Sequence, residues 1–461
     1  MKYDLVIIGA GPAGMSAAIE ASGLGLSCLL LDEQPRGGGQ IYRNAGHQRL
    51  SDKQILGPEY QAGVPLLEAF KASQCEHITG ATAWQIEPKG EVFYSVAGKS
   101  QAVSADRVLI ASGAQERPMP IPGWTLPGVM TAGGAQTLLK NSGLAAEDAV
   151  FAGCGPLLYL IVWQYVKAGV NVKAVLDTTE SGNYVAAAKE IGAAWSGRSY
   201  LKKGLKLISD IKAAGVTIHK HVDQIAAIAD DQQKLTAVSF SGKSGRHKLD
   251  TDHLFLHQGV IPQVNLAMAS GCKHHWNDQQ LCWTPETDAW GQSNEERLFI
   301  AGDGLGIGGA VAAALRGRLA ALQIASLSGN LDASARDSRA QPIRKALDKE
   351  LAFRPFLDVL YRPAEQFRSP PESETVICRC EEVRLSELKA ATEKGCLGPN
   401  QLKSFTRCGM GPCQGRQCGI TVSETLSRLT KRPVEETGYY RLRAPVKPLN
   451  LSELASLKDE N

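Results

Sequence analysis

Residues 1–14 read MKYDLVIIGAGPAG, a short apolar run that is followed at once by a glycine-rich turn. An Ala-rich amphipathic stretch comes next, so this order predicts a strand, a turn and a helix. The turn holds Gly9, Gly11 and Gly14 in the pattern G-x-G-x-x-G. The first glycine permits a tight turn, the second lets a pyrophosphate approach the backbone, and the third lets the helix pack closely on the strand. The start of the helix would then face the phosphates with free N–H groups.

An acidic residue stands where a dinucleotide site needs one. Residues 26–31 (LSCLLL) predict the next buried strand, and Asp32 closes it, near the usual distance for an acid that binds ribose hydroxyls. The glycine pattern alone is a weak signal, but strand, helix and acid together predict a dinucleotide site. The flexible segment 37–40 (GGGQ) follows, and it either lies along the pyrophosphate and flavin or is an ordinary surface loop.

A distant second signal favours FAD over NAD in this site. Residues 297–301 (RLFIA) predict a strand that runs into Asp303 and then into an Ala/Leu-rich helix near 309–326. A carboxylate there can accept a hydrogen bond from hydroxyls of a flavin nucleotide, and the helix start can face the pyrophosphate. Viewed alone, Asp303 is also a good helix N-cap.

A second strand–glycine–helix unit begins at residues 149–153 (AVFAG), so the first dinucleotide fold is split by an inserted one. The third glycine position of this unit is Leu158, whose side chain would push the helix away from the strand. Tyr159 and Trp163 add bulk, although Asp177 could still serve a ribose. We expect a retained scaffold with a blocked or altered site rather than productive NAD(P) binding.

The eleven cysteines are unevenly distributed. Five are scattered, and six crowd one short segment: Cys378, Cys380, Cys396, Cys408, Cys413 and Cys418. In a cytosolic protein such crowding indicates metal binding rather than disulfides. The C-x-C spacing is unusual for zinc, whereas iron–sulfur clusters accept varied spacings of four cysteines.

Composition and charge limit the remaining function classes. The formal net charge is +3 over 461 residues, which gives no indication of a nucleic-acid partner or of an acidic membrane surface. The N-terminus lacks a signal-peptide core, and an apolar run of about 18 residues is absent, so no membrane-spanning segment is expected. We therefore expect a cytoplasmic protein, with peripheral attachment to the inner membrane as a second option.

Four motifs in order, GAGPAG, Asp32, IASGAQERP and LFIAGDG, resemble the pyridine nucleotide-disulfide reductase superfamily over about residues 1–330. A redox-active cysteine pair is missing, because no cysteine follows Asp32 until Cys75 and the inserted segment has only Cys154. Disulfide reduction is therefore disfavoured. The predicted cofactor-binding residues are Gly9, Gly11, Pro12, Gly14, Asp32, Glu33, Gly39, Gln40, Gly113 and Asp303, and no catalytic residue is assigned.

The segments ICRCEEV and TRCGMGPCQGRQC resemble the bacterioferritin-associated ferredoxin-like 2Fe–2S domain over about residues 374–428. This resemblance implies cluster ligation by Cys378, Cys380, Cys413 and Cys418. Cys408 is then an extra thiol or a packing residue, with ligation as the lesser option. The glycines of GMGPCQG would let backbone N–H groups reach the cluster sulfurs.

The predicted fold class is α/β: a split FAD-binding Rossmann-like domain, an inserted NAD-like Rossmann domain and a small C-terminal helical 2Fe–2S domain. The expected domains are 1–117 and 256–330 for the two parts of the FAD-binding domain, 118–255 for the inserted domain, 331–373 for a linker with one helix, 374–430 for the cluster domain, and 431–461 for an irregular tail.

The whole chain, including PRGGGQIYR, resembles the larger nucleotide-binding subunit of the opine oxidase, hydroxyproline dehydrogenase and hydrogen cyanide synthase family. The resemblance implies an oxidoreductase subunit that acts on CH–NH or CH–NH2 donors and transfers electrons. Substrate would be oxidised on a partner resembling D-amino-acid oxidases. Further options are a small ferredoxin-like third subunit, and an FMN where two subunits meet.

Two functions from other classes stay open. One is a stand-alone NAD(P)H-dependent ferredoxin or nitrite reductase component, which Leu158 argues against. The other is a non-catalytic scaffold that holds a structural adenine nucleotide. Two smaller groups are interpreted as structural: Cys272, His274, His275 and Cys282 as part of a hairpin rather than a zinc site, and His257 as a core histidine rather than a flavin contact.

Overall fold

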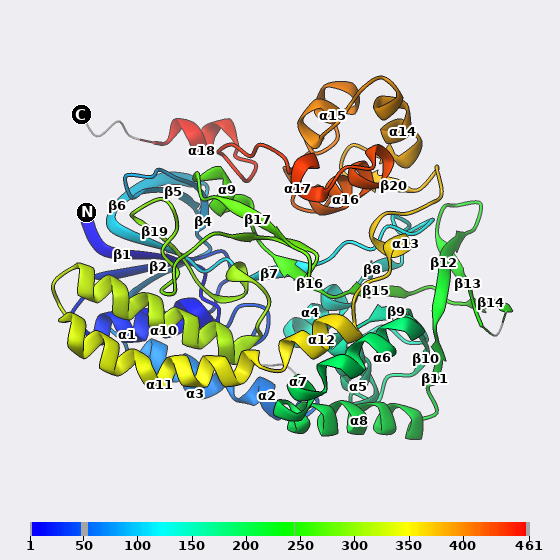
Figure 1. Ribbon diagram of the computed structural model, residues 1–461, viewed down its shortest axis with the longest axis horizontal. Helices are drawn as coiled ribbons and strands as arrows, with labels where there is room; N and C mark the ends of the chain where they lie inside the picture. The colour runs from blue at the N-terminus through cyan, green and yellow to red at the C-terminus, as the bar shows by residue number, and fades with distance from the viewer. Residues whose placement is uncertain (1, 48–53, 244, 458–461) are drawn as a thin grey trace.

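The computed structural model describes residues 2–47, 54–243 and 245–457. Two α/β units lie side by side, and a small helical unit with α14–α16 sits above their junction (Figure 1). The first and last parts of the chain meet, because the tail that carries α18 (Leu451–Ala455) runs back along the first unit. This arrangement confirms the predicted fold class.

The first unit is built on one sheet with the strand order β3-β2-β1-β6-β5-β4. The additional strand β19 pairs with the end of β6, on the side of β6 away from β1. The parallel part, in which the dinucleotide strands lie, contains β1, β2, β3, β6 and β19. The bounds are β1 Lys2–Ile8, β2 Cys28–Asp32, β3 Glu76–Thr79, β4 Thr82–Ile86, β5 Glu91–Val96, β6 Lys99–Ile110 and β19 Leu298–Ile300.

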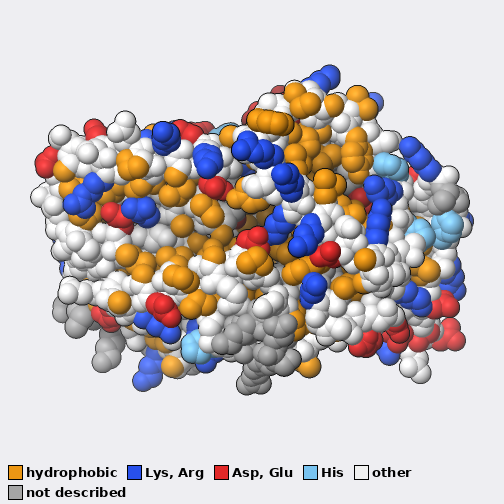
Figure 2. All heavy atoms as spheres, turned by 90° about the horizontal axis from the view of Figure 1, so that it is seen from below, with side chains coloured by type: hydrophobic (Ala, Val, Ile, Leu, Met, Phe, Trp, Pro, Cys, Tyr) orange, Lys and Arg blue, Asp and Glu red, His pale blue; other side chains and the backbone are white. Residues whose placement is uncertain are grey.

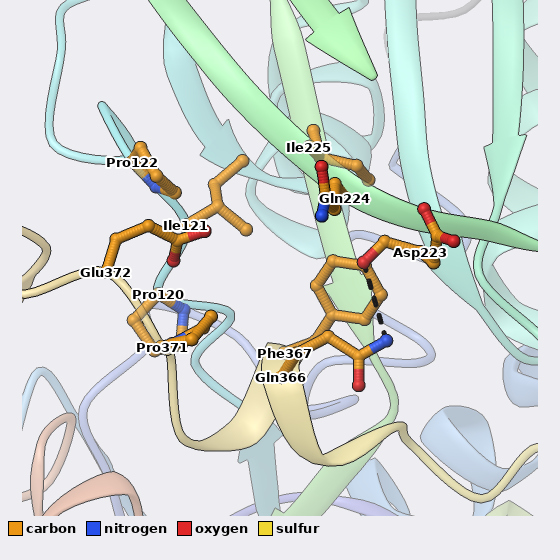
Figure 3. A pocket seen from close by; sticks show the side chains of 10 residues that line it. All are labelled: Pro120, Ile121, Pro122, Asp223, Gln224, Ile225, Gln366, Phe367, Pro371 and Glu372. Atoms are coloured by element: carbon orange, nitrogen blue, oxygen red, sulfur yellow. Dashed lines mark hydrogen bonds between the residues drawn. The ribbon is translucent and has the colours of Figure 1, made fainter. Parts of the chain in front are cut away.

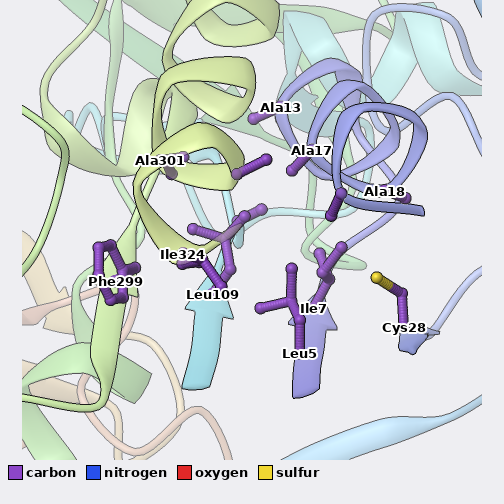
Figure 4. Close-up of a cluster of buried hydrophobic side chains, with 14 of the residues drawn as sticks. Leu5, Ile7, Ala13, Ala17, Ala18, Cys28, Leu109, Phe299, Ala301 and Ile324 are labelled. Atoms are coloured by element: carbon purple, nitrogen blue, oxygen red, sulfur yellow. The ribbon is translucent and has the colours of Figure 1, made fainter. Parts of the chain in front are cut away.

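Helices cover one face of this sheet through a core of small and aliphatic side chains. In Figure 4, Leu5, Ile7 and Leu109 point from the strands toward α1 (Pro12–Gly23) and α10 (Ala310–Leu327). Alanines line the contact between the two helices, so their backbones approach closely. At Gly317 of α10 the two helix backbones are so close that a Cβ would lie 2.1 Å from the carbonyl oxygen of Ala13. The shorter α2 (Pro58–Gln61) and α3 (Gly63–Lys71) precede β3.

The inserted unit has an all-parallel sheet with the order β11-β10-β9-β15-β8. Its strands are β8 Val129–Thr131, β9 Ala149–Cys154, β10 Val172–Asp177, β11 Thr217–Lys220 and β15 Leu254–Gln258. Its helices are α4 Ala132–Ser142, α5 Pro156–Lys167, α6 Ser181–Ala187, α7 Ile191–Ser196 and α8 Arg198–Ala213, with the 3-10 helix η1 at Ala188–Glu190. An antiparallel ribbon is added by β12 Val222–Ala229, β13 Leu235–Gly242 and β14 Gly245–Asp250.

Two antiparallel strands join the units, β7 (Ala114–Glu116) and β16 (Val260–Pro262). The chain returns to the first sheet through α9 (Asn265–Ala269) and the hairpin of β17 (His274–Asn277) and β18 (Cys282–Pro285), as the sequence predicts. The inserted sheet includes β15, so its last strand ends a few residues beyond the expected boundary at 255.

Residues 331–373, interpreted from the sequence as a linker, are mostly helical and packed: α11 is Ala333–Leu351, α12 is Arg354–Leu360 and α13 is Glu365–Arg368. The expected helix is therefore present, but it begins about ten residues earlier than its pattern indicated. Its few apolar residues, such as Ala340 and Ile343, are buried against the α1–α10 core. The helical spacing of these apolar residues is hard to recognise because most of their neighbours in the sequence are charged or polar, so the sequence favoured a linker.

The C-terminal unit has a short hairpin and four helices around a separate small core. Its elements are β20 Val376–Cys378, β21 Val383–Arg384, α14 Leu385–Glu393, α15 Pro399–Thr406, α16 Gly419–Thr430 and α17 Val434–Thr437. The tail is partly ordered by the first unit: the amide of Val446 donates to the Trp84 carbonyl at 3.0 Å, and the Ser456 hydroxyl accepts from the Ser100 amide at 2.8 Å.

A cavity of about 290 Å³ lies where the segment after α12 packs on the inserted unit (Figure 3). Its walls come from residues 120–122, β12 and residues 366–372. It touches neither the glycine turns nor the cysteines. Among the described residues one helix, α10, is long and apolar enough to cross a membrane, and it is packed between α1 and α11 as a core helix is.

Candidate functional site

The turn from β1 to α1 leaves an open space above the helix start. A Cβ on Gly9 would lie 2.5 Å from the Ala111 carbonyl oxygen, and one on Gly14 would lie 1.9 Å from the Gly9 carbonyl oxygen. At Gly11 the nearest atom would be 3.9 Å away. Gly9 and Gly14 are therefore required by packing, whereas Gly11 borders free space at the N-terminus of α1, next to Pro12 at the first helical position.

The acid at the end of β2 fixes this turn. The Asp32 carboxylate accepts from the Ala10 amide at 2.5 Å and from the Gln34 amide at 2.7 Å. The next acid, Glu33, is exposed and forms an ion pair with Lys447 of the C-terminal tail. Asp32 thus stays within the turn, while Glu33 contacts the tail.

The glycine loop after β2 lies against the turn and is held by a lysine that the sequence analysis missed. Gly39 has φ +59°, and a Cβ there would lie 2.8 Å from the Gly11 Cα. Lys140 of α4 donates to the carbonyl oxygens of Gln40 and Ile41 at 3.0 and 3.1 Å. Burial lowers the pKa of Lys140 to about 7. The sequence does contain one sign of this role, because the spacing of α4 places Lys140 on the buried face of an amphipathic helix.

The last two predicted cofactor-binding residues follow β6 and β19. Gly113 has φ +70° with open space at its Cβ position. Asp303 accepts from the amides of Gly308 and Gly309 at 2.9 and 3.0 Å, just before α10. Asp303 therefore organises the loop before the helix start, a role close to the N-cap alternative.

The predicted residues gather at one edge of the first sheet, because they follow the carboxyl ends of β1, β2, β6 and β19. This edge is where open parallel sheets bind their ligands. The open space at Gly11, the two helix starts and the carboxylates of Asp32 and Asp303 fit the pyrophosphate and hydroxyls of a dinucleotide.

The corresponding edge of the inserted sheet is filled by the protein itself. Leu158 is fully buried, and the Tyr159 hydroxyl donates to the Asp177 carboxylate at 2.6 Å inside the core. The Cys154 thiol lies 3.5 Å from the Tyr361 carbonyl oxygen, so the chain after α12 covers the glycine turn. The candidate ribose acid is thus engaged and 2% exposed, which adds a physical reason to the expectation of a blocked site.

Five cysteines of the C-terminal unit form one contiguous group. The Sγ atoms of Cys378, Cys408 and Cys418 lie within 4.8 Å of one another, and all three residues are buried. Cys413 hydrogen-bonds both Cys418 and Cys380, of which Cys380 is exposed. The four predicted ligands are therefore brought together, and Cys408 is among them rather than apart. The choice of four ligands from these five thiols stays a prediction.

The thiols share hydrogen bonds with one another, and these bonds shift their pKa values in opposite directions. Hydrogen bonds from Cys408 and Cys418 lower the pKa of the Cys378 thiol to about 2, and a hydrogen bond from Cys418 lowers that of Cys413 to about 5, whereas the same contacts raise the pKa of Cys408 to about 12 and that of Cys418 well above its ordinary value. Thiolates are the form that binds metals, and an iron–sulfur cluster takes four of them. The donor set therefore fits such a cluster.

The glycines between these cysteines have a packing role that the sequence did not reveal. A Cβ on Gly409 or Gly415 would meet the ring of Tyr440, at 2.4 and 2.6 Å, and one on Gly411 would meet the Cβ of Cys380 at 2.4 Å. The Tyr440 hydroxyl donates toward the Cys408 sulfur at 3.4 Å and lies 3.7 Å from the Cys418 sulfur. Tyr440 thus closes the cysteine group from the side of the tail.

Buried charges attach the cysteine unit to the rest of the chain. Glu424 of α16 lies between Arg117, at 3.3 Å, and Arg368. Burial lowers the pKa of each arginine to about 10, so both keep their charge at neutral pH. The loop between Cys413 and Cys418 is also bound, because Gln115 donates to the Arg416 carbonyl at 2.6 Å.

The two groups interpreted as structural make hydrogen bonds within the protein. His257 is buried and its Nδ1 lies 2.6 Å from a Glu116 carboxylate oxygen. His274 contacts the Cys272 carbonyl at 2.8 Å, and His275 contacts the Thr284 hydroxyl at 3.1 Å. Within the described ranges, the cysteine group is the cluster of side chains suited to a metal.

Two family models match the chain. The model described as pyridine nucleotide-disulphide oxidoreductase matches residues 3–326, and the model of the sarcosine oxidase A3 domain matches residues 372–457. The first match covers both dinucleotide folds, and the fold that it describes binds FAD. The second covers the cysteine unit and the tail.

Curated relatives and a solved structure extend over nearly the whole chain. The opine oxidase A subunit of Rhizobium meliloti is 43% identical over 99% of this chain and 88% of the relative. Hydrogen cyanide synthase subunit HcnB of Pseudomonas aeruginosa is 31% identical over the full length of both chains. The structure of L-proline dehydrogenase from P. horikoshii superposes with a TM-score of 0.70, at 19% identity, over 98% of this chain and 79% of that chain, which shows a shared fold.

Proposed function

The chain belongs to the pyridine nucleotide-disulphide oxidoreductase family, among the opine oxidase A subunits and their relatives, and from this premise we propose that it carries electrons within a heteromeric amino-acid dehydrogenase. It is an oxidoreductase subunit. The proposal adds that a partner subunit oxidises the C–N bond of an opine or a hydroxyproline-type amino acid, and that this chain receives the electrons.

One observation carries the proposal: two candidate cofactor sites are present, while the nucleotide-binding edge of the inserted sheet is closed. Leu158, the Tyr159–Asp177 hydrogen bond and the chain at Tyr361 occupy the region where a nicotinamide nucleotide would bind. A chain with redox sites but without an evident donor site is best explained as a relay. The same closure disfavours the alternative of a stand-alone NAD(P)H-dependent reductase.

The proposed cofactors are FAD at the Gly9–Gly14 turn and a 2Fe–2S cluster on Cys378, Cys380, Cys413 and Cys418. A flavin takes up two electrons together and an iron–sulfur cluster passes them singly, so the pair converts one mode into the other. This chain's own residues hold the two sites in a fixed relation, because Arg117 and Gln115 follow the strand β6 and bind Glu424 and the Arg416 carbonyl of the cysteine unit.

The proposed partners are a flavoprotein subunit resembling D-amino-acid oxidases and a small ferredoxin-like subunit, with an FMN where two subunits meet as a further option. We propose a cytoplasmic location for the complex. The opine oxidase and hydrogen cyanide synthase relatives are each named as one subunit of their enzyme, which supports a heteromeric assembly.

Co-expression tests this function. The chain is purified alone and together with a flavoprotein subunit that resembles D-amino-acid oxidases, and opine and amino-acid dehydrogenase activities are measured with an artificial acceptor. We expect no activity from the chain alone and activity from the pair. A chain that holds only ATP and no flavin would instead support the scaffold alternative.

A further inference from the structure

The loop that lies on the nucleotide turn of the first unit is anchored by the inserted unit. Residues 37–45 follow β2, yet Tyr42 and Ala45 are buried in the hydrophobic core that contains α4 and α5. The side-chain amide of Asn44 also donates to the side-chain oxygen of Asn141 in α4, at 2.9 Å. A ligand on the turn is therefore bordered by a loop that the inserted unit holds in place.

This loop has carbonyl oxygens on one side and free amides on the other. The Tyr42 amide donates to the Gly38 carbonyl oxygen at 3.0 Å and closes a single turn. The amides of residues 39–41 come before that bond, and among the residues that the structure describes they find no acceptor. The carbonyl oxygens of such a turn point the opposite way, and two of them accept from Lys140.

Close packing places the amide side of the loop beside the start of α1. A Cβ on Gly39 would lie 2.8 Å from the Gly11 Cα, and Gly11 itself borders open space. Free amides from both segments therefore face the space in which a pyrophosphate would bind. Lys140 acts from the far side of the loop, because it binds the carbonyl oxygens and so fixes the direction of the amides.

Lys140 is a buried cation without an acidic partner in the described part of the chain. It is 4% exposed, and none of the ion pairs between described residues uses it. Two charged or titratable groups face it, Arg43 of the loop and Tyr60 of α2, whose ring centroid lies 5.5 Å from the Lys140 Nζ. Burial, and then the charge of Arg43, lowers the pKa of Lys140 to about 7.

Exposed basic side chains are in a different situation. Figure 2 shows Lys and Arg side chains spread over one face of the molecule, with Asp and Glu side chains among them. Water and nearby acids stabilise such charges, so a ligand on the nucleotide turn has little effect on them. Lys140 has neither water nor an acid beside it, so the negative charge of a ligand affects this lysine most.

We propose that Lys140 is a positioning residue for the nucleotide, and that it takes up a proton when a pyrophosphate binds at the Gly9–Gly14 turn. The inference rests on the proposed function, because that function supplies the dinucleotide. The proton comes from the solvent and stays on Nζ. The ammonium group binds the loop carbonyl oxygens more strongly than a neutral amine does, so the amides of residues 39–41 are held toward the ligand.

The direction of the pH dependence follows from the free protein. Without a ligand the pKa of Lys140 is about 7, and the negative charge of a pyrophosphate raises it. Below pH 7 the lysine is charged in both states, so binding takes up almost no proton. Above pH 7 binding requires a proton, so affinity falls as the pH rises, by about tenfold from pH 7 to pH 8.5.

Calorimetric titration in buffers of different ionisation enthalpy measures both the affinity and the number of protons taken up. The full chain, stripped of nucleotide, is titrated with FAD and separately with ADP-ribose, two pyrophosphate diesters that do not titrate near neutral pH. We expect uptake of more than about half a proton at pH 8 and almost none at pH 6. This buffer series uses the wild type, so it does not depend on the folding of any variant.

Three variants assign the proton to Lys140. Lys140→Met should bind at least about tenfold more weakly at pH 7 and take up no proton, because it loses the charge-assisted hydrogen bonds to the loop. Lys140→Arg keeps its charge at every pH used, so it should bind more tightly than Lys140→Met and without pH dependence. The control Lys167→Met removes an exposed lysine at the end of α5 in the same unit, and it should behave like the wild type.

The outcomes separate this inference from the proposed function. Wild-type binding without proton uptake, or equal uptake in Lys140→Met, would overturn the role of Lys140 and leave the relay untouched. Binding of ADP-ribose with proton uptake, but no binding of FAD, would support Lys140 and contradict the proposed flavin. Binding of neither compound would overturn both.

Discussion

Replacing Glu424 by glutamine should loosen the cysteine unit from the two α/β units. The substitution keeps the volume of the side chain, so the packing of α16 is not the variable. It removes the one negative charge between the guanidinium groups of Arg117 and Arg368, which are 3% and 14% exposed. Both arginines then keep like charge without the carboxylate that lies between them, and only Arg368 still feels other carboxylates, those of Glu365 and Glu180.

The magnitude follows from the burial of the pair. Breaking a buried ion pair by neutralising one partner costs about 3–5 kcal/mol. We expect the lower end of this energy range, because Arg117 still donates hydrogen bonds to the carbonyl oxygens of Gln280 and Leu281, at 3.2 and 2.5 Å. About 3 kcal/mol corresponds to about a 150-fold larger population of the undocked state.

Hydrogen exchange measures this population directly. Amides of α16 should exchange about a hundredfold faster in Glu424→Gln, while those of β1 and β6 should not change. The control is Glu374→Gln, because Glu374 pairs with Arg384 on the surface, where both side chains are more than half exposed. Exposed pairs contribute about 0–1 kcal/mol, so the control should differ from wild type by less than about fivefold. Equal effects of the two variants would refute the idea that buried charges attach the unit.

Three further predictions concern the cofactor sites. Gly11→Val should remove FAD from the purified chain, measured by acid extraction and chromatography, because its side chain fills the space at the start of α1; retained FAD would contradict the placement of the pyrophosphate. Cys413→Ser should abolish the electron paramagnetic resonance signal of a reduced 2Fe–2S cluster while Cys408→Ser leaves it, and the opposite result would reassign the ligands. Lys140 has a folded pKa of about 7, below its unfolded value, so the unfolded state binds more protons above pH 7 and stability should rise with pH. From pH 7 to 8.5 the gain should be about 1.5 kcal/mol relative to Lys140→Met in urea unfolding, and parallel pH profiles would contradict it.

The nucleotide fold could be predicted because its signals are local. Gly9, Gly14 and Asp32 act within one turn, where spacing in the sequence and distance in space agree. The inserted fold could be predicted for the same reason. The packing of α11 could not be predicted, because its buried residues Ala340 and Ile343 are small or isolated among charged residues. The surface that they cover comes from α1 and α10, which are built from other parts of the sequence.

The cysteine group shows the limit of such reasoning. Spacing along the chain identified the segment, but it could not place Cys408 relative to Cys378, because α14 and α15 lie between them. The contacts of Tyr440 with the glycines and of Arg117 with Glu424 join residues far apart in sequence. Neither carries a local pattern, so only the three-dimensional arrangement reveals them.

The claim that this chain relays electrons without a donor site of its own is tested most directly by stopped-flow reduction of its flavin. The purified chain, alone and as a complex with its partner subunit, is mixed anaerobically with an opine or with NADH, and flavin absorbance is followed. The account predicts no rapid bleaching of the isolated chain by either reductant and bleaching by the opine in the complex. Rapid reduction of the isolated chain by NADH or by an opine would contradict it.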